Sequence, residues 1–214
     1  MNVSLISYSS SEDHKSLLDM ICYCARVSNP ANQELNQKNE GLVRYLMRNH
    51  HWSPFEMVSI CLEINTTRDI ARQILRHRSF SFQEFSQRYA VVEQTVEPKE
   101  ARLQDYKNRQ NSIPCEDETL HNEWVKQQEK VSKASKEAYD WAIEHGIAKE
   151  VARSVLPEGL TPSRMYMNGT LRSWIHYIEL RSGNGTQKEH REIAIACAHV
   201  IQSIFPMIME CISN

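Results

Sequence analysis

The sequence predicts a single α+β domain, spanning residues 1–214, in which helices outnumber strands. Its 41% hydrophobic and 24% charged residues are ordinary for a globular protein, and the length suits one sizeable core. Residues 57–67 alternate strictly between apolar and polar side chains, which indicates a half-buried strand. Longer stretches with helical spacing surround this strand. The chain has no internal repeat, low-complexity tract or linker that would divide it.

The N-terminal quarter is expected to form a strand and two helices. Residues 2–8 alternate and predict a short strand. The polar residues 11–13 are expected to start a helix that continues to about Val27, because apolar residues then recur at helical spacing. A second helix is expected from about residue 39 to residue 50, after which the proline in the segment 51–56 interrupts the pattern.

The strand at 57–67 leads into a short helix. Thr67 is expected to cap this helix, which covers residues 68–78 and carries a carboxylate in its first turn, where it suits the helix dipole. Residues 79–89 alternate too strictly for a helix and predict an extended strand or loop. The segment 95–116 is polar and irregular, and no element is predicted in it.

The second half of the chain is predicted to be mostly helical. A long helix over 117–145 is ended by a glycine. The elements expected after it are a helix at 148–157 stopped by its proline, a strand at 163–170, a helix at 171–182, and a last helix at 188–212 with a kink at Pro206.

Composition excludes several classes of protein. The net charge is −2, so the chain lacks the overall basic character of a nucleic-acid-binding protein, and an anion site would have to use local charge. No window approaches about 18 uninterrupted apolar residues, and no signal-peptide pattern is present, so no membrane span is expected. The six cysteines form no CxxC pair and are interpreted as reduced thiols of a cytoplasmic protein.

Basic, aromatic and hydroxyl side chains cluster in residues 72–89. Arg72 and Arg76 are four apart, as are Gln73 and His77, so two adjacent faces of the predicted helix are polar. An anion would relieve the repulsion between the arginines, and a guanidinium fork grips phosphate or carboxylate in two places. The alternative is a solvated basic face that is paired with nearby carboxylates.

The extended segment after this helix carries three polar side chains of one parity. Glu84, Ser86 and Arg88 would point to one face of a strand, where an acceptor, a hydroxyl and a guanidinium suit a polar heterocycle. An exposed strand face is the alternative. Ser86 has no GxSxG setting and is not interpreted as a hydrolase nucleophile.

The helix predicted over 171–182 carries a second polar group. Arg172 and His176 lie near one stripe of it, and Arg181 closes the helix, where it could serve only to satisfy the helix dipole. His190 and His199 are nine residues apart on the last helix and face opposite sides, so they are interpreted as unrelated helix histidines and no metal site is predicted.

Residues 76–89 read Arg-His-Arg, seven residues, Ser, one residue, Arg-Tyr. This pattern resembles the signature of the flavin-dependent thymidylate synthases. Further stretches resemble elements of the same family across most of the chain. They are ARVSNP at 25–30, HWSPFE at 51–56, VARSVLP at 151–157, and the segment 171–191.

The resemblance implies a fold in which helices flank a small, mostly antiparallel sheet, and a homotetramer with active sites between subunits. It implies FAD as cofactor, dUMP as substrate, and NADPH and methylenetetrahydrofolate as co-substrates. NADPH would reduce FAD, the methylene group would pass from folate to C5 of dUMP, and the reduced flavin would supply the hydride that completes the methyl group of dTMP. No cysteine nucleophile is needed, which fits cysteines in unremarkable contexts.

The resemblance also implies roles for individual residues. Arg181, Ser86 and His51 are expected to lie closest to the chemistry. The residues expected to contact the flavin are Ser53, Arg76, His77, Arg78, Glu84, Arg172 and His176. The residues expected to bind the nucleotide are Gln73, Glu84, Ser86, Arg88, Arg153 and Arg181.

Three positions depart from the family pattern, and three alternatives stay open. Met57, Gln83 and Gly185 put individual flavin or folate contacts in question. The alternatives are a nucleic-acid-binding module, a flavoprotein of the same fold that acts on another pyrimidine nucleotide, and an inactive relative. The segment 95–116 is expected to border the active site of a neighbouring subunit, because it contains polar side chains without an obvious partner. These are Arg102, Asn108, Arg109 and Gln110.

Overall fold

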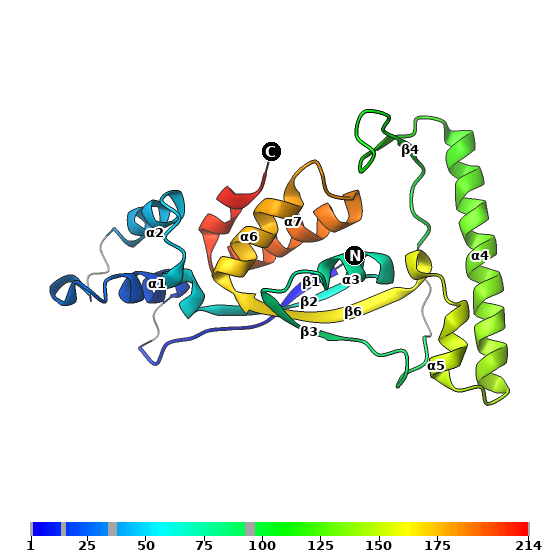
Figure 1. Cartoon of the computed structure of the whole chain (residues 1–214), viewed down its shortest axis with the longest axis horizontal. Coiled ribbons are helices and arrows are strands. Elements are labelled where there is room, and N and C mark those ends of the chain that lie inside the picture. Colours follow the sequence, from blue (N-terminus) through cyan, green and yellow to red (C-terminus); the bar gives the residue numbers. More distant parts are fainter. Residues whose placement is uncertain (1, 14–15, 34–37, 93–96, 214) are drawn as a thin grey trace.

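The computed structural model describes residues 2–13, 16–33, 38–92 and 97–213. Within these ranges the prediction of an α+β fold around a small antiparallel sheet is confirmed (Figure 1). The main sheet has four strands in the order β1-β2-β6-β3, and every neighbouring pair is antiparallel. The strands are β1 (Asn2–Tyr8), β2 (Ser59–Thr67), β3 (Phe80–Glu84) and β6 (Pro162–Thr170).

The alternation in β2 sets one face of the sheet against the core. Ile60, Leu62 and Ile64 are fully buried, and Leu62 lies opposite Met167 of β6. The intervening side chains are only half-buried, because the helices that pack on the sheet cover one face of it (Figure 1). The apolar side of β2 therefore decides which way the sheet faces.

The pairing of β3 with β6 requires a residue without a side chain at Gly169 of β6. Gly169 lies opposite Phe80, and a Cβ atom added there would meet the Phe80 ring at 2.4 Å. The absence of a side chain lets the ring lie flat on β6, where it also packs edge-on against Trp174 at 4.9 Å between ring centroids. This contact joins the start of β3 to the helix that follows β6.

The helices gather in three places along the long axis of the molecule (Figure 1). Helices α6 and α7 lie on the sheet, α1 and α2 lie at one end, and α4 and α5 form an arm at the other. Their bounds are α1 Leu17–Ala25, α2 Asn39–Arg48, α3 Arg68–Ile74, α4 Glu118–Glu144, α5 Lys149–Ala152, α6 Leu171–Ser182 and α7 Lys188–Gln202.

Three expectations about the helices were wrong in detail. Helix α1 starts at Ser16, whose side chain and Asp19 form a reciprocal capping box, and not at residues 11–13. Thr67 stands at the N-cap position of α3, but its hydroxyl bonds to Asp69 instead of a backbone N–H. Helix α7 ends at Gln202 because Pro206 starts a separate 3-10 helix, so the chain turns where a kink was expected.

The segment 97–116 is not irregular throughout. Two short strands pair in an antiparallel hairpin, β4 (Arg102–Gln104) with β5 (Ser112–Pro114). The turn is held from inside by Asp105, whose carboxylate accepts from the backbone N–H groups of Lys107 and Asn108. Residues 95 and 96, which the same expectation covered, lie outside the described residues.

Candidate functional site

The candidate site begins where the end of α3 meets the end of α6. The Arg181 Nε–H group donates a hydrogen bond to Nε2 of His77 over 2.9 Å. An imidazole nitrogen that accepts from an arginine must be unprotonated, so His77 is neutral and carries its proton on Nδ1. Burial, reinforced by the charge of Arg181, lowers the pKa of His77 to about 4. Two residues predicted for the site are thus in direct contact.

Gln73 extends this contact through residues that the sequence did not identify. Its carboxamide lies 3.3 Å from Nδ1 of His190 and donates to Oε1 of Gln187 over 2.7 Å. His190 is completely buried, and its Nε2 lies 3.1 Å from the hydroxyl of Tyr177. His190 was not among the residues predicted for the site, although it contacts Gln73. Its position on the apolar stripe of α7, with Ile193 and Cys197, was the signal that could have revealed it.

Three of the residues predicted to contact flavin, Ser53, Arg172 and His176, lie around the first turns of α6. The hydroxyl of Ser173 donates to the carbonyl of Ser79 over 3.1 Å, which holds the Arg-His-Arg segment against this helix. Arg172 forms an ion pair with Glu56 of the 3-10 helix Ser53–Met57. His176 packs edge-on against Trp52, with ring centroids 4.7 Å apart. Ser53, Arg172 and His176 therefore border one region with Arg78.

The arginines of this region suit an anionic cofactor. Arg76 and Arg78 are exposed, and neither forms an ion pair with any residue in the described part of the chain. Two unpaired guanidinium groups beside a neutral histidine can bind a diphosphate through charge-assisted hydrogen bonds. The residues present therefore fit a diphosphate-bearing flavin such as FAD. His51, two residues before Ser53 in the sequence, is also exposed. Its ring lies edge-on to that of Tyr45, with the ring centroids 5.9 Å apart.

The predicted nucleotide residues are not all brought together. Strand β3 ends at Glu84, whose carboxylate accepts from the hydroxyl of Ser163 over 2.6 Å and lies 3.4 Å from Arg68. Ser86 and Arg88 follow in a turn, so the expectation that they share one strand face with Glu84 was wrong.

The rest of this set lies toward the arm. Arg88 forms an ion pair with Glu150 of α5 over 3.3 Å, and Arg153 follows that helix directly. Between Ser86 and Arg88, the side chain of Gln87 is buried while its Nε2 has no hydrogen-bond partner among the described residues. A buried amide without a hydrogen-bond partner is costly.

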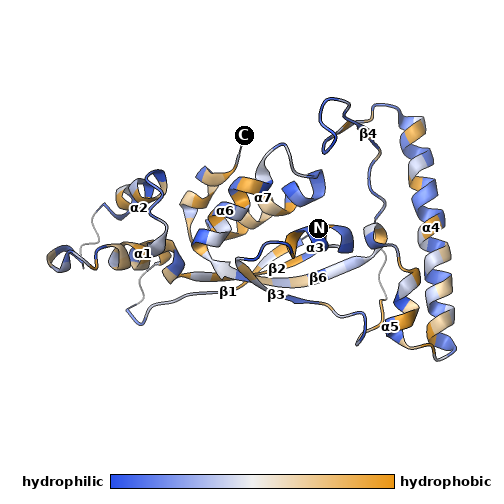
Figure 2. Cartoon of the chain, viewed as in Figure 1, coloured by the Kyte–Doolittle hydropathy of each residue, from blue (hydrophilic) through white to orange (hydrophobic). Residues whose placement is uncertain are grey.

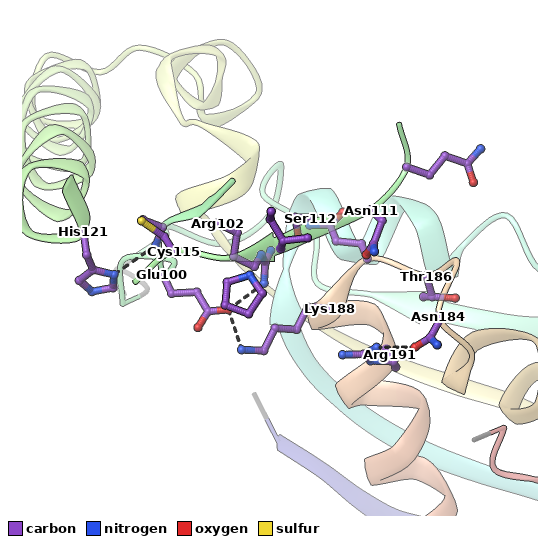
Figure 3. Close-up of a pocket in the computed structure, with 15 residues that line it drawn as sticks. Glu100, Arg102, Asn111, Ser112, Cys115, His121, Asn184, Thr186, Lys188 and Arg191 are labelled. Carbon is purple, nitrogen blue, oxygen red and sulfur yellow. Dashed lines mark hydrogen bonds and ion pairs between the residues drawn. The ribbon is translucent and has the colours of Figure 1, made fainter. Parts of the chain in front are cut away.

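A cavity of about 530 Å³ adjoins the site between the β4–β5 hairpin and the loop that joins α6 to α7 (Figure 3). Arg102 of the hairpin pairs with Glu189 over 2.6 Å and with Glu100 over 3.1 Å. Lys188 reaches the same Glu100 over 2.6 Å. The expectation that Arg102 lacks a partner was wrong, because its partners lie 87 residues away on α7 as well as next to it.

A family description reading "Thymidylate synthase complementing protein" matches residues 4–207 of this chain. A protein of Paramecium bursaria Chlorella virus 1, named probable flavin-dependent thymidylate synthase, is 53% identical over 190 residues, which cover 89% of this chain and 88% of the relative. A Synechocystis flavin-dependent thymidylate synthase is 52% identical over 189 residues, 88% of this chain and 86% of that one. The chain belongs to this family.

A solved structure of the same architecture agrees with the assignment. A UMP/dUMP methylase, PolB from Streptomyces cacaoi bound with 5-Br UMP, is similar with a TM-score of 0.82 and 26% identity, over 98% of this chain and 92% of that chain. The fold predicted from the family resemblance is therefore confirmed.

No group of three or more His, Cys, Asp and Glu side chains within the described ranges could hold a metal ion. No helix in that part of the molecule is long and apolar enough to cross a membrane. All six cysteines are free thiols, and burial raises the pKa of Cys22 to about 11 and that of Cys211 to about 12. Thiols with raised pKa values are poor nucleophiles at neutral pH.

Proposed function

We propose that this protein is a flavin-dependent thymidylate synthase that methylates dUMP to dTMP. Methylenetetrahydrofolate would be the carbon donor and NADPH the reductant. The observation that carries the proposal is the contact of Arg181 with His77 beside Gln73, in a chain that is 53% identical to a relative named for this activity. The relatives' name and the family-matching residues point to the same chemistry.

Arg181 is the residue proposed to stabilise charge on the pyrimidine. Its Nε–H is held by neutral His77, which leaves the other guanidinium N–H groups available to a uracil oxygen. Negative charge that develops on the ring during carbon transfer would be stabilised by this fixed cation. Since the pKa of His77 is about 4, the imidazole does not compete for the anion at neutral pH.

The cofactor region would be completed by this chain's arginines and by the start of α6. Arg76 and Arg78 would bind the diphosphate, while Ser53, Arg172 and His176 would border the rest of the flavin. FAD bound there and reduced by NADPH would supply the hydride that completes the methyl group. His51 would lie beside flavin and folate, at the edge of the same region.

The nucleotide would be held by residues from both ends of β3. Gln73 and Arg181 would contact the base, and Ser86, Arg88 and Arg153 would contact the phosphate and sugar, with Glu84 between them. Arg88 would exchange its ion pair with Glu150 for the phosphate. Exchange of an exposed ion pair costs little, because such a pair contributes at most about 1 kcal/mol.

The assembly proposed is a homotetramer with active sites between subunits. Helix α4 has 27 residues, of which only Gln128, Tyr139 and Ala142 are buried. Beside these residues the helix carries an exposed apolar stripe with spacings of three, four and seven residues, as in helix–helix contacts. The stripe consists of Leu120, Trp124, Val131, Ala134, Ala138 and Trp141, and Figure 2 shows hydrophobic segments at intervals along α4.

A charge in this stripe tests the assembly. Val131→Asp should lower the mass measured by sedimentation velocity to that of a smaller assembly, while the circular dichroism of the subunit stays unchanged. Lys133→Asp, two residues further on the exposed polar side, is the matched control and should leave the mass unchanged. An unchanged mass in Val131→Asp would refute the proposed role of α4.

A cytoplasmic location is also proposed, since six free thiols suit a reducing compartment.

The proposed reaction is tested by mixing the purified protein with FAD and recording its absorption spectrum. NADPH is then added without oxygen, with and without dUMP, and dTMP is measured after methylenetetrahydrofolate is supplied. Flavin binding, bleaching at a rate that responds to dUMP, and dTMP formation are expected. Protein that retains no flavin, or that forms no dTMP while flavin is reduced, would refute the proposal.

A second candidate function is methylation of UMP. The solved relative PolB is described as a UMP/dUMP methylase, so the fold accepts both sugars there. The assay above, run with UMP in place of dUMP, separates the two. Product from dUMP alone supports thymidylate synthesis, and comparable product from UMP would favour the broader activity.

A further inference from the structure

A line of polar side chains crosses the interior from α6 to the hairpin side of the molecule. The hydroxyl of Tyr177 lies 3.1 Å from Nε2 of His190, and Nδ1 of His190 lies 3.3 Å from Oε1 of Gln73. Gln73 Nε2 then donates to Gln187 Oε1 over 2.7 Å, and Gln187 Nε2 donates to Glu189 Oε2 over 2.9 Å. Three helices and the loop before α7 are joined by this chain.

The carboxylate at one end of the line fixes the direction of every bond. Glu189 is buried against Arg102, and although burial alone would raise its pKa, its backbone N–H, Gln187 and Arg102 lower it, so the group is ionised. An ionised carboxylate can only accept. Gln187 must therefore turn its nitrogen to Glu189 and its oxygen to Gln73, which forces the nitrogen of Gln73 toward Gln187.

The direction continues to the buried histidine. Because the oxygen of Gln73 faces His190, Nδ1 of His190 carries the proton and donates, and Nε2 accepts from the Tyr177 hydroxyl. Both rings are at most 1% exposed, so no water competes for these positions. Burial lowers the pKa of His190 to about 3 and raises that of Tyr177, which keeps both groups neutral. A reversed Gln73 carboxamide would face its nitrogen to the N–H of His190 and its oxygen to the oxygen of Gln187.

We propose that His190 is a positioning residue that holds the oxygen of the Gln73 carboxamide, whose nitrogen is held by Gln187, and so lets this site distinguish uracil from cytosine. The inference rests on the proposed function, in which Gln73 contacts the base. A locked carboxamide presents one remaining N–H and one remaining oxygen lone pair in fixed places. Uracil and cytosine differ by exchange of donor and acceptor at ring positions 3 and 4, so one fixed orientation matches only one of them.

Two substitutions of His190 separate its two contacts. The amide nitrogen of Asn is bonded to Cγ, as Nδ1 is, so His190→Asn can still donate to Gln73. His190→Gln reaches one bond further, toward Tyr177, and leaves the oxygen of Gln73 without its donor. His199→Asn, an exposed histidine on the same helix, is the matched control.

Binding of dUMP and of dCMP to each FAD-loaded protein is measured by titration of the flavin spectrum, beside its melting temperature. His190→Gln should weaken dUMP binding about tenfold and reduce the preference for dUMP over dCMP by a similar factor, the scale of one hydrogen bond. His190→Asn should stay within about threefold of the unaltered protein for dUMP. Tyr177→Phe, which removes one hydroxyl, should also narrow the preference, because His190 Nε2 then loses its donor and only the bond to Gln73 still favours the proton on Nδ1.

The outcomes distinguish the inference from the function on which it rests. If the unaltered protein binds no dUMP, the proposed function fails. If it binds dUMP and prefers it to dCMP, but folded His190→Gln and Tyr177→Phe proteins keep the same preference, the positioning role is refuted. If His190→Gln does not fold, Tyr177→Phe alone decides, since a purely structural role would lower the melting temperature without changing the preference.

Discussion

Helices α6 and α4 are both amphipathic, but they are buried to different extents within the subunit. Seven of the 12 residues of α6 are buried by the subunit's own sheet and α7, whereas three of the 27 residues of α4 are buried. Trp174 on α6 is fully enclosed, and Trp141 on α4 is 55% exposed. Side chains proposed for chemistry are fixed on α6, where packing leaves them one position. Helix α4 instead keeps an apolar stripe uncovered, and this is the surface proposed for contact with another subunit.

The largest expected effect on stability comes from replacing Trp174 on α6, and the matching change is at Trp141 on α4. Trp174→Ala should reduce the free energy of unfolding by about 3–5 kcal/mol, because it opens a cavity and leaves the carbonyl of Ile60 without its indole N–H donor at 3.0 Å. Trp141→Ala should change subunit stability by less than about 1 kcal/mol but weaken association. Urea denaturation of dilute protein measures the first, and sedimentation measures the second. Equal losses of stability in both would contradict the difference between α6 and α4.

Arg181 is expected to show the next largest effect, and on activity more than on stability. Arg181→Ala should lower kcat for dTMP formation about 100-fold to 1,000-fold, as for removal of a donor to developing negative charge. Arg181→Lys should recover part of the rate, because it keeps the charge and loses the guanidinium fork. Arg44→Ala, which breaks an exposed ion pair with Glu210, should leave kcat unchanged. A fully active Arg181→Ala enzyme would remove this residue from the mechanism.

Replacing either of two glycines by alanine adds one methyl group, at a packed position in β6 or at an open position in α2. Gly169→Ala should destabilise the subunit by about 1–3 kcal/mol, since its Cβ would overlap the Phe80 ring. Gly41→Ala lies on α2 with no atom within 4 Å of the new Cβ, and it should stabilise by about 0.4–1 kcal/mol. Thermal unfolding of the two variants should shift in opposite directions. A Gly169→Ala protein as stable as the unaltered one would mean that β3 does not rest on β6 as described.

A change of pH tests the burial of His77 and His190 without altering any side chain. The pKa values of His77 and His190 are lowered to about 4 and about 3, so the unfolded chain binds protons first as the pH falls below about 6.5. Stability should be full above pH 6.5 and decline as the pH falls toward 4. His190→Asn should flatten this decline, and His199→Asn should not. Urea midpoints at pH 7 and pH 5 measure the slope, and equal midpoints for the unaltered protein would contradict the burial of these rings.

Sequence patterns predicted the parts of the fold that depend on local period. The alternation of Ile60, Leu62 and Ile64 identified β2, because a strand with one buried face repeats every two residues. The hairpin β4–β5 was missed because each of its strands has only three residues, which is too short to show a period. The capping box at Ser16 was missed because Ser11 offered the same kind of residue earlier in the chain.

The site was predictable only where a motif or one helix contains it. Arg76, His77 and Arg78 stand together in sequence, and their family pattern identified them. The contact of His77 with Arg181 spans 104 residues, and that of Gln73 with His190 spans 117. No local pattern encodes such pairs, because the sheet and the packing of α6 on α7 bring them together. The separation of Ser86 and Arg88 from Glu84 also depended on where β3 ends.

The central proposal is that each active site lies between subunits, with Arg181 supplied by one subunit and Arg88 by another. It is tested most directly by mixing two inactive variants, Arg181→Ala and Arg88→Ala, unfolding and refolding them together, and measuring dTMP formation with FAD and NADPH. Each variant alone should be inactive, and random mixing should restore about a quarter of the unaltered activity, since a site with both intact residues forms by chance. A mixture as inactive as its components, beside an active refolded control, would contradict the shared site.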